Sequence, residues 1–140
     1  MPEILPPSLD DLQGLADRAF AAIPPELARH VQGVAILIED FPDPDVQRDM
    51  ALDSPFDLLG LYHGVSLAEK SFGDAPQDLD RIFLYRRPIL DYWCETGEDL
   101  AHVVRHVLIH EIGHHFGLSD DDMEALEAQV ADDEQDDETA

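Results

Sequence analysis

The sequence predicts an α+β fold in one domain, with a small sheet of three to four strands and helices at both ends. The chain has 140 residues, a length typical of one domain. Apolar residues make up 44% of it, which is enough for a small core. Three short apolar runs have the length of buried strands, and one long segment has the apolar period of a helix.

The N-terminal part predicts a helix and then a strand. Residues 8–23 place apolar side chains at helical spacing, and Ser8 with Asp11 forms the pattern of a capping box. Pro24-Pro25 stops this helix. Residues 34–38 are a continuous apolar run after a glycine, which indicates a buried strand.

The middle of the chain predicts two further strands between loops. Residues 39–57 are rich in proline and acids, so we expect a long loop with one helical turn. A strand is expected over 58–63, and a loop over 64–80. Residues 81–87 indicate a third, partly exposed strand. A short helix is expected from Pro88 to Cys94, with that cysteine buried.

Residues 96–116 give the clearest helix pattern. Thr96 and Asp99 suggest a capping box at its start. Its apolar residues cover more than half of the helical circumference, so we expect this helix at the centre of the domain. Gly117 ends it, and Ser119 then caps a last helix.

The charge balance excludes some partners. Eight Lys and Arg residues stand against 32 Asp and Glu residues, for a net charge of −24. Such a chain is repelled by nucleic acid and by anionic membranes. No apolar run is long enough to cross a bilayer, a single cysteine rules out an internal disulfide, and we see no signal peptide. We expect a cytoplasmic protein.

The C-terminal end carries much of this charge. Residues 119–140 hold eleven acids and no base. Residues 132–138 have no apolar member and can bury nothing to offset the entropy of ordering. We therefore expect a domain over 1–131 and a disordered acidic tail over 132–140.

One motif in the long helix suggests metal chemistry. In His110-Glu111-Ile112-Gly113-His114 the two histidines are four residues apart, so one ion can meet both. Glu111 lies about 100° from His110 around the helix, where it can reach a water held by that ion. Gly117 allows a sharp turn that brings Asp120 back under the histidines as a third ligand. Three protein ligands and one open position are typical of catalytic zinc.

The motif resembles that of the Asp-zincin metallopeptidases, H-E-x-x-H-x-x-G-x-x-D. The stretches 60–67, 80–88 and 110–123 more closely resemble the bacterial mini-zincins, and the similarity covers about residues 30–125. This resemblance implies a small sheet packed against the active-site helix. It also implies an edge strand that holds substrate in extended form, for which we expect 81–87.

The resemblance also implies a site and a reaction. The zinc ligands are expected to be His110, His114 and Asp120, and Glu111 the catalytic base. The implied reaction is hydrolysis of peptide bonds, in which Glu111 assists attack of a zinc-bound water on the carbonyl. The expected partner is a peptide or protein substrate. The alternatives are a zinc-stabilised binding module without catalysis and a metal-dependent ribonuclease, which Glu111 and the net charge oppose.

Neighbouring residues leave alternatives open. Asp121 or Asp122 could replace Asp120 as a ligand, and His102 and His106 could extend the metal face or orient a ligand. Further candidates have weaker support. Glu124 and Glu127 could be metal ligands, but their offsets fit worse. Tyr62, His63 and Tyr85 could donate a proton or hydrogen bond to the reacting carbonyl, and Arg86 with Arg87 could hold a substrate carboxylate. Met123 could pack beneath the metal.

Overall fold

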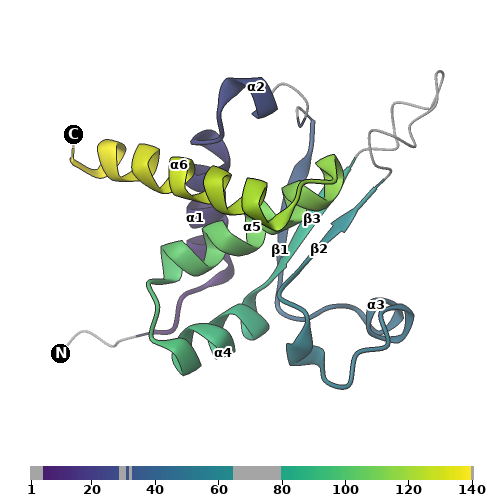
Figure 1. Ribbon diagram of the computed structural model, residues 1–140. Coiled ribbons are helices and arrows are strands. Elements are labelled where there is room, and N and C mark those ends of the chain that lie inside the picture. Colours follow the sequence, from purple (N-terminus) through teal and green to yellow (C-terminus); the bar gives the residue numbers. More distant parts are fainter. Residues whose placement is uncertain (1–4, 29–30, 32, 65–79, 140) are drawn as a thin grey trace.

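The computed structural model describes residues 5–28, 31, 33–64 and 80–139, and it confirms the α+β class (Figure 1). The first half contains α1 (Leu9–Ala21), α2 (Pro25–Ala28), β1 (Ala35–Glu39), α3 (Pro44–Asp49), a 3-10 turn (Pro55–Asp57) and β2 (Gly60–His63). The second half contains β3 (Arg81–Tyr85), α4 (Arg86–Thr96), α5 (Leu100–Phe116) and α6 (Asp120–Thr139).

The three strands form one mixed sheet in the order β1-β3-β2. β1 runs parallel to β3, with Ile36 opposite Ile82. β2 runs antiparallel to β3, with Leu61 opposite Phe83. In this order β3 is hydrogen-bonded on both sides, and β2 is an edge of the sheet that the structure describes.

The expectation that 81–87 is the edge strand was wrong, because β3 is the central strand. Arg86 and Arg87, which the prediction included in this strand, already belong to α4. The remaining strand buries Ile82 and Leu84 fully, and such apolar residues are typical of a strand with neighbours on both sides. The edge strand that contacts α5 is β2.

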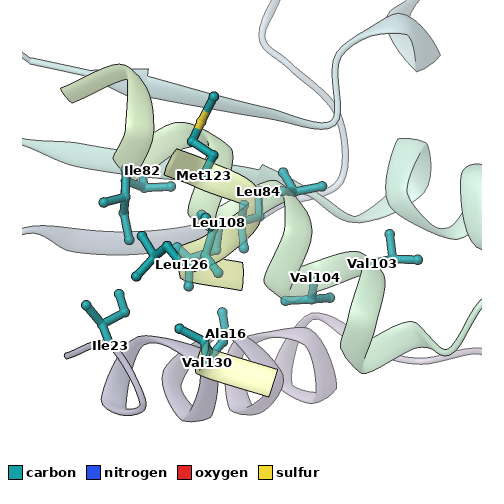
Figure 2. Close-up of a cluster of buried hydrophobic side chains, with 14 of the residues drawn as sticks. Ala16, Ile23, Ile82, Leu84, Val103, Val104, Leu108, Met123, Leu126 and Val130 are labelled. Carbon is teal, nitrogen blue, oxygen red and sulfur yellow. The ribbon is translucent and has the colours of Figure 1, made fainter. Parts of the chain in front are cut away.

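α5 lies at the centre of the domain, as its apolar circumference predicts. It contacts α1, α4, α6, β2 and β3 (Figure 1). Figure 2 shows side chains of α1, β3, α5 and α6 that meet in one cluster. Its fully buried members on these four elements are Leu12, Ala16, Ala19, Ile82, Leu84, Val103, Val104, Leu108, Ile109, Ile112 and Val130. This packing fixes the helix that carries the motif.

Helix α6 docks on α5 through a glycine. A Cβ atom at Gly113 would overlap the Sδ atom of Met123, so the absence of a side chain allows the two helices to approach closely. Met123, Leu126 and Val130 are buried, as the sequence predicts for the inner face of the last helix. Met123 thus packs directly against the motif.

Helix ends agree with the sequence in part. The Ser8 capping box is present, with the Asp11 N–H donating to Ser8 Oγ at 3.1 Å. The capping box expected at Thr96 and Asp99 was wrong, because Asp99 caps α5 without a side-chain hydrogen bond. Thr96 instead ends α4, where its hydroxyl donates to the carbonyl of Tyr92.

At the C-terminal end, α6 continues to Thr139 and so includes residues 132–139, for which the sequence predicts a disordered tail. Adding a residue to a helix already anchored by Val130 costs much less than starting one, which favours this continuation. The division into 1–131 and 132–140 stays a prediction.

Three smaller expectations can be compared with the structure. Residues 65–79 of the expected loop lie outside the described residues. Cys94 is exposed, not buried, because α4 buries only Pro88 and Ile89, near its start. Within the described part of the chain, no helix has the length and hydropathy needed to cross a membrane.

Candidate metal centre

The motif lies on the last turns of α5, next to a sharp turn. Gly117 ends the helix in the left-handed conformation, with φ of 65° and ψ of 34°. The Leu118 N–H then donates to the Gly113 carbonyl at 3.0 Å, which closes the helix end. α6 begins at Asp120, with Ser119 Oγ accepting from the Asp122 N–H. The turn expected at the glycine therefore brings the first turn of α6 back beside α5.

Glu111 is one of the buried acids of the described residues, and an edge strand holds it. Its Oε2 atom accepts the Tyr62 N–H of β2 at 2.9 Å and lies 3.4 Å from His114 Nδ1. Burial raises the pKa of the Glu111 carboxyl, and this effect is opposed by the charge of His114 and by the Tyr62 N–H. A fixed carboxylate with a raised pKa is a better proton acceptor than an exposed one.

Gly60 allows β2 to approach Glu111. A Cβ atom there would lie 2.7 Å from Val107 Cγ1 and 3.1 Å from the Phe83 carbonyl oxygen. Both neighbours belong to packed elements, so β2 must shift away from α5 to make room. We expect Gly60→Ala to lower the free energy of unfolding by about 1–3 kcal/mol, measured by urea denaturation.

Gly14 provides the matched control for that substitution. It lies on the exposed side of α1, and a Cβ atom there meets nothing within 4 Å. Gly14→Ala should raise the free energy of unfolding by about 0.5–1 kcal/mol, since alanine is the better helix former. Two substitutions of the same kind are thus expected to have opposite signs. A Gly60→Ala chain as stable as the Gly14→Ala chain would contradict the close approach of β2 to α5.

The two histidines of the motif have different surroundings. His110 is partly buried, and its pKa is lowered first by burial and then by the neighbouring His106. It is therefore neutral at pH 7, which is the form that ligates a metal. The His114 side chain is 63% exposed and lies beside Glu111. His114 and Asp120 also influence the pKa of His110, in opposite directions, so both lie near it.

The structure brings together a different set of three potential ligands. Among the described residues, the ligand atoms of His106, His110 and Glu127 all lie within 4.8 Å of one another. His110, His114 and Asp120 do not meet that criterion, although Asp120 lines the same hollow as His110. The donors of both sets are imidazole nitrogens and one carboxylate, a combination that zinc accepts. The residues around His110 therefore fit a divalent metal such as zinc.

The sequence gives only weak support to Glu127 and His106 as metal ligands. The Glu127 offset from the motif fits a ligand poorly in sequence, but α6 turns back and faces α5. The His106 Nδ1 atom lies 2.9 and 3.1 Å from the two Glu127 oxygens. The signal in the sequence is the four-residue step from His106 to His110, which continues the step from His110 to His114.

The stability of the metal-free chain should depend on Glu111 and pH. Folding raises the pKa of the Glu111 carboxyl above its ordinary value of 4.5. The neutral carboxyl therefore adds to the free energy of unfolding, and this contribution is fully present below pH 4.5. It is lost as pH rises through the folded pKa. Glutamine keeps an acceptor for the Tyr62 N–H and does not ionise.

We therefore expect Glu111→Gln to melt at a higher temperature than the parent chain at pH 7 in the presence of chelator. The difference should shrink as the pH falls toward 4, and melting curves across this range measure it. Equal melting temperatures at both pH values would show that burial does not disfavour the ionised carboxyl.

Other candidates have structural partners. The Tyr62 hydroxyl donates to the buried Asp80 at 2.5 Å, and burial with this contact raises its pKa. Tyr85 is fully buried, and burial with nearby carboxylates raises its pKa to about 12. Arg86 donates to the Pro7 carbonyl at 2.7 Å and to Asp40 at 3.1 Å. His63 is exposed at the end of β2. These contacts favour structural roles for Tyr85 and Arg86.

A cleft of about 310 Å³ lies beside Glu111, between α5 and the segment that enters β2. Its apolar walls are formed by Leu58, Leu59, Val103 and Val107. His110 and Glu111 lie at the same cleft, together with Gly60, Tyr92 and Glu98. A cleft with apolar walls and a few polar groups can accept an apolar side chain of a bound molecule.

Comparison with known proteins connects this geometry to a family. A family model described as zincin-like metallopeptidase matches residues 31–130. A solved structure, a conserved hypothetical protein from Thermo thermophilus, is 25% identical with a TM-score of 0.53. That similarity covers 79% of this chain and 94% of that chain. No curated protein matches.

The matched residues include the whole sheet, the motif on α5 and the docked part of α6. They make up more than half of the chain, and they agree with the resemblance to the mini-zincins. On this match, the chain belongs to the zincin-like metallopeptidase family.

Proposed function

We propose that the chain is a zinc-dependent peptidase. The observation that carries this proposal is the position of Glu111. Its buried carboxylate is fixed by the Tyr62 N–H of the edge strand, next to His114 and at the cleft beside α5. A purely structural carboxylate does not need a raised pKa beside a cleft, whereas a general base benefits from one.

His110, His114 and Asp120 would hold the zinc in this proposal. Their support is the family match, the proximity of His114 and Asp120 to His110, and a neutral His110. When bound, zinc supplies a Lewis acid that polarises a carbonyl group and lowers the pKa of water.

Side chains and backbone of this chain perform the remaining tasks. Glu111 accepts a proton from water and delivers it to the leaving nitrogen, while the Tyr62 N–H keeps its Oε2 atom in place. The outer edge of β2 offers backbone groups to an extended peptide. Leu58, Leu59 and Val107 exclude water from one part of the cleft.

The net charge of the chain limits the classes of partner that we expect. A net charge of −24 opposes nucleic acid and anionic membranes as partners, so we propose peptide or protein substrates.

The proposal is tested with the full chain loaded with one equivalent of zinc. We expect cleavage of a mixed peptide library, detected by mass spectrometry, and loss of cleavage on addition of chelator. Restoring zinc should restore cleavage. A zinc-loaded, folded chain that cleaves no peptide at any pH between 5 and 9 would exclude the peptidase.

A zinc-stabilised binding module is the second candidate. The observation in its favour is that His106, His110 and Glu127 join α5 to α6, as a structural metal would. This candidate predicts that chelator lowers the melting temperature strongly, while the zinc-loaded chain cleaves no peptide.

A further inference from the structure

A hollow between α5 and α6 lies on the other side of His110 from the cleft. Three histidines at four-residue steps, His102, His106 and His110, line it from α5. Asp120 and Glu127 line it from α6. All three histidines also border the cleft, so they form a ridge between the two spaces.

The groups on this ridge are close enough to share an ion. The His106 and His110 rings are 4.2 Å apart between centroids. The two carboxylate oxygens of Glu127 lie 2.9 and 3.1 Å from His106 Nδ1. Ligand atoms around tetrahedral zinc are about 3.4 Å apart, given bonds of about 2.0–2.1 Å. Small side-chain rotations therefore suffice to turn these contacts into ligation.

Glu127 has the surroundings of a metal-binding carboxylate. Its side chain is only 14% exposed, although it belongs to a strongly acidic helix. It faces His106 directly, and His102 Nε2 lies 3.9 Å from its Oε1 atom. Arg105 reaches His102 Nδ1 at 3.1 Å and so orients that ring. The His106 side chain is 46% exposed, which leaves a route for an ion from solvent.

We propose that His106, His110 and Glu127 form an alternative position for a divalent transition metal. It lies one helical turn before the position formed by His110, His114 and Asp120, here called the HExxH position. The inference rests on the proposed function only in that both use His110. A neutral imidazole has one ring nitrogen able to ligate, so His110 serves one ion at a time. The two positions are therefore alternatives for a single ion.

An ion in this position connects α5 to α6, whereas the base lies beside His114. The Glu111 carboxylate lies beside His114, 3.4 Å from its Nδ1 atom, whereas Glu127 lies beside His106. In this inference the alternative position stores the metal ion, which can then be transferred to His114 and Asp120.

The test removes the HExxH position and asks whether metal binding survives. In the full chain, His114→Ala with Asp120→Asn leaves His106, His110 and Glu127 intact, and both replaced side chains are exposed. We expect this double variant to bind one equivalent of zinc, measured by competition with a chromogenic chelator. Adding Glu127→Gln or His106→Ala should weaken binding at least tenfold.

Glu95→Gln is the control, because Glu95 is an exposed acid on α4 and lines neither the hollow nor the cleft. In the double variant it should leave the affinity unchanged. Circular dichroism checks that each variant is folded, and the two separate substitutions guard against failure of either one. A folded double variant that binds no zinc, or that loses as much affinity from Glu95→Gln as from Glu127→Gln, overturns the inference.

Two outcomes separate this inference from the proposed function. Wild-type chain that binds one zinc but cleaves no peptide contradicts the peptidase and leaves the binding measurements valid. Wild-type chain that binds two equivalents on α5 contradicts the sharing of His110.

Discussion

Replacing Glu111 with glutamine should lower the rate of peptide hydrolysis by about 10²–10⁴-fold, because the amide cannot accept a proton from water. Zinc binding should persist, since the proposed ligands His110, His114 and Asp120 are unchanged. Glutamine also keeps an acceptor for the Tyr62 N–H, which the carboxylate accepts at 2.9 Å. The measurement is the initial rate on a cleaved peptide, with zinc content determined on the same sample.

Glu95→Gln is the control for this experiment, because Glu95 is an exposed acid on α4. It should leave the rate unchanged, which separates the loss of a base from the loss of one negative charge. If Glu111→Gln hydrolyses peptides at the parent rate with zinc bound, Glu111 is not the base. If it loses both hydrolysis and zinc, the carboxylate acts in metal binding instead.

The elements that the sequence predicts best are those with local causes. The helical period of residues 96–116 and the glycine after it define α5 to within a few residues, because both signals arise within the helix. The i, i+4 spacing places His110 and His114 near one another by helix geometry alone. The capping box at Ser8 is equally local, since the hydrogen bonds join residues three positions apart.

The features that could not be predicted depend on contacts between distant residues. The order of the strands is decided by how β2 and β3 pair, across residues 65–79, and no local pattern reports it. The strand expected over 81–87 also ran two residues too far, because the start of α4 at Arg86 was missed. The Tyr62–Glu111 hydrogen bond joins residues 49 positions apart.

The same reasoning applies to Glu127. Its offset from the motif looks unsuitable along the sequence, but the turn at Gly117 reverses the chain, and docking of Met123 on Gly113 sets how α6 faces α5. These two features place α6 so that Glu127 lies beside His106 on α5. Metal sites built from two packed helices are therefore harder to predict than those built from one.

Shortening a side chain at the centre of α5 should have the largest effect on stability. Leu108 is fully buried in the cluster shared by α1, β3, α5 and α6 (Figure 2). Leu108→Ala removes buried apolar surface and leaves a cavity, which should lower the free energy of unfolding by about 2–5 kcal/mol. Small domains have a total of about 5–15 kcal/mol, so much of the stability is lost. Urea denaturation in the presence of chelator measures the change without any contribution from metal.

Leu5→Ala is the control, because Leu5 is 74% exposed and its truncation creates no cavity. Its effect should stay within about 0.5 kcal/mol. The comparison also tests the metal site. Leu108 lies two residues before His110 on α5, the helix that carries all the proposed histidine ligands. If Leu108→Ala were as mild as Leu5→Ala, α5 would not be the central helix. The ridge of histidines would then lack the rigid support that both metal positions require.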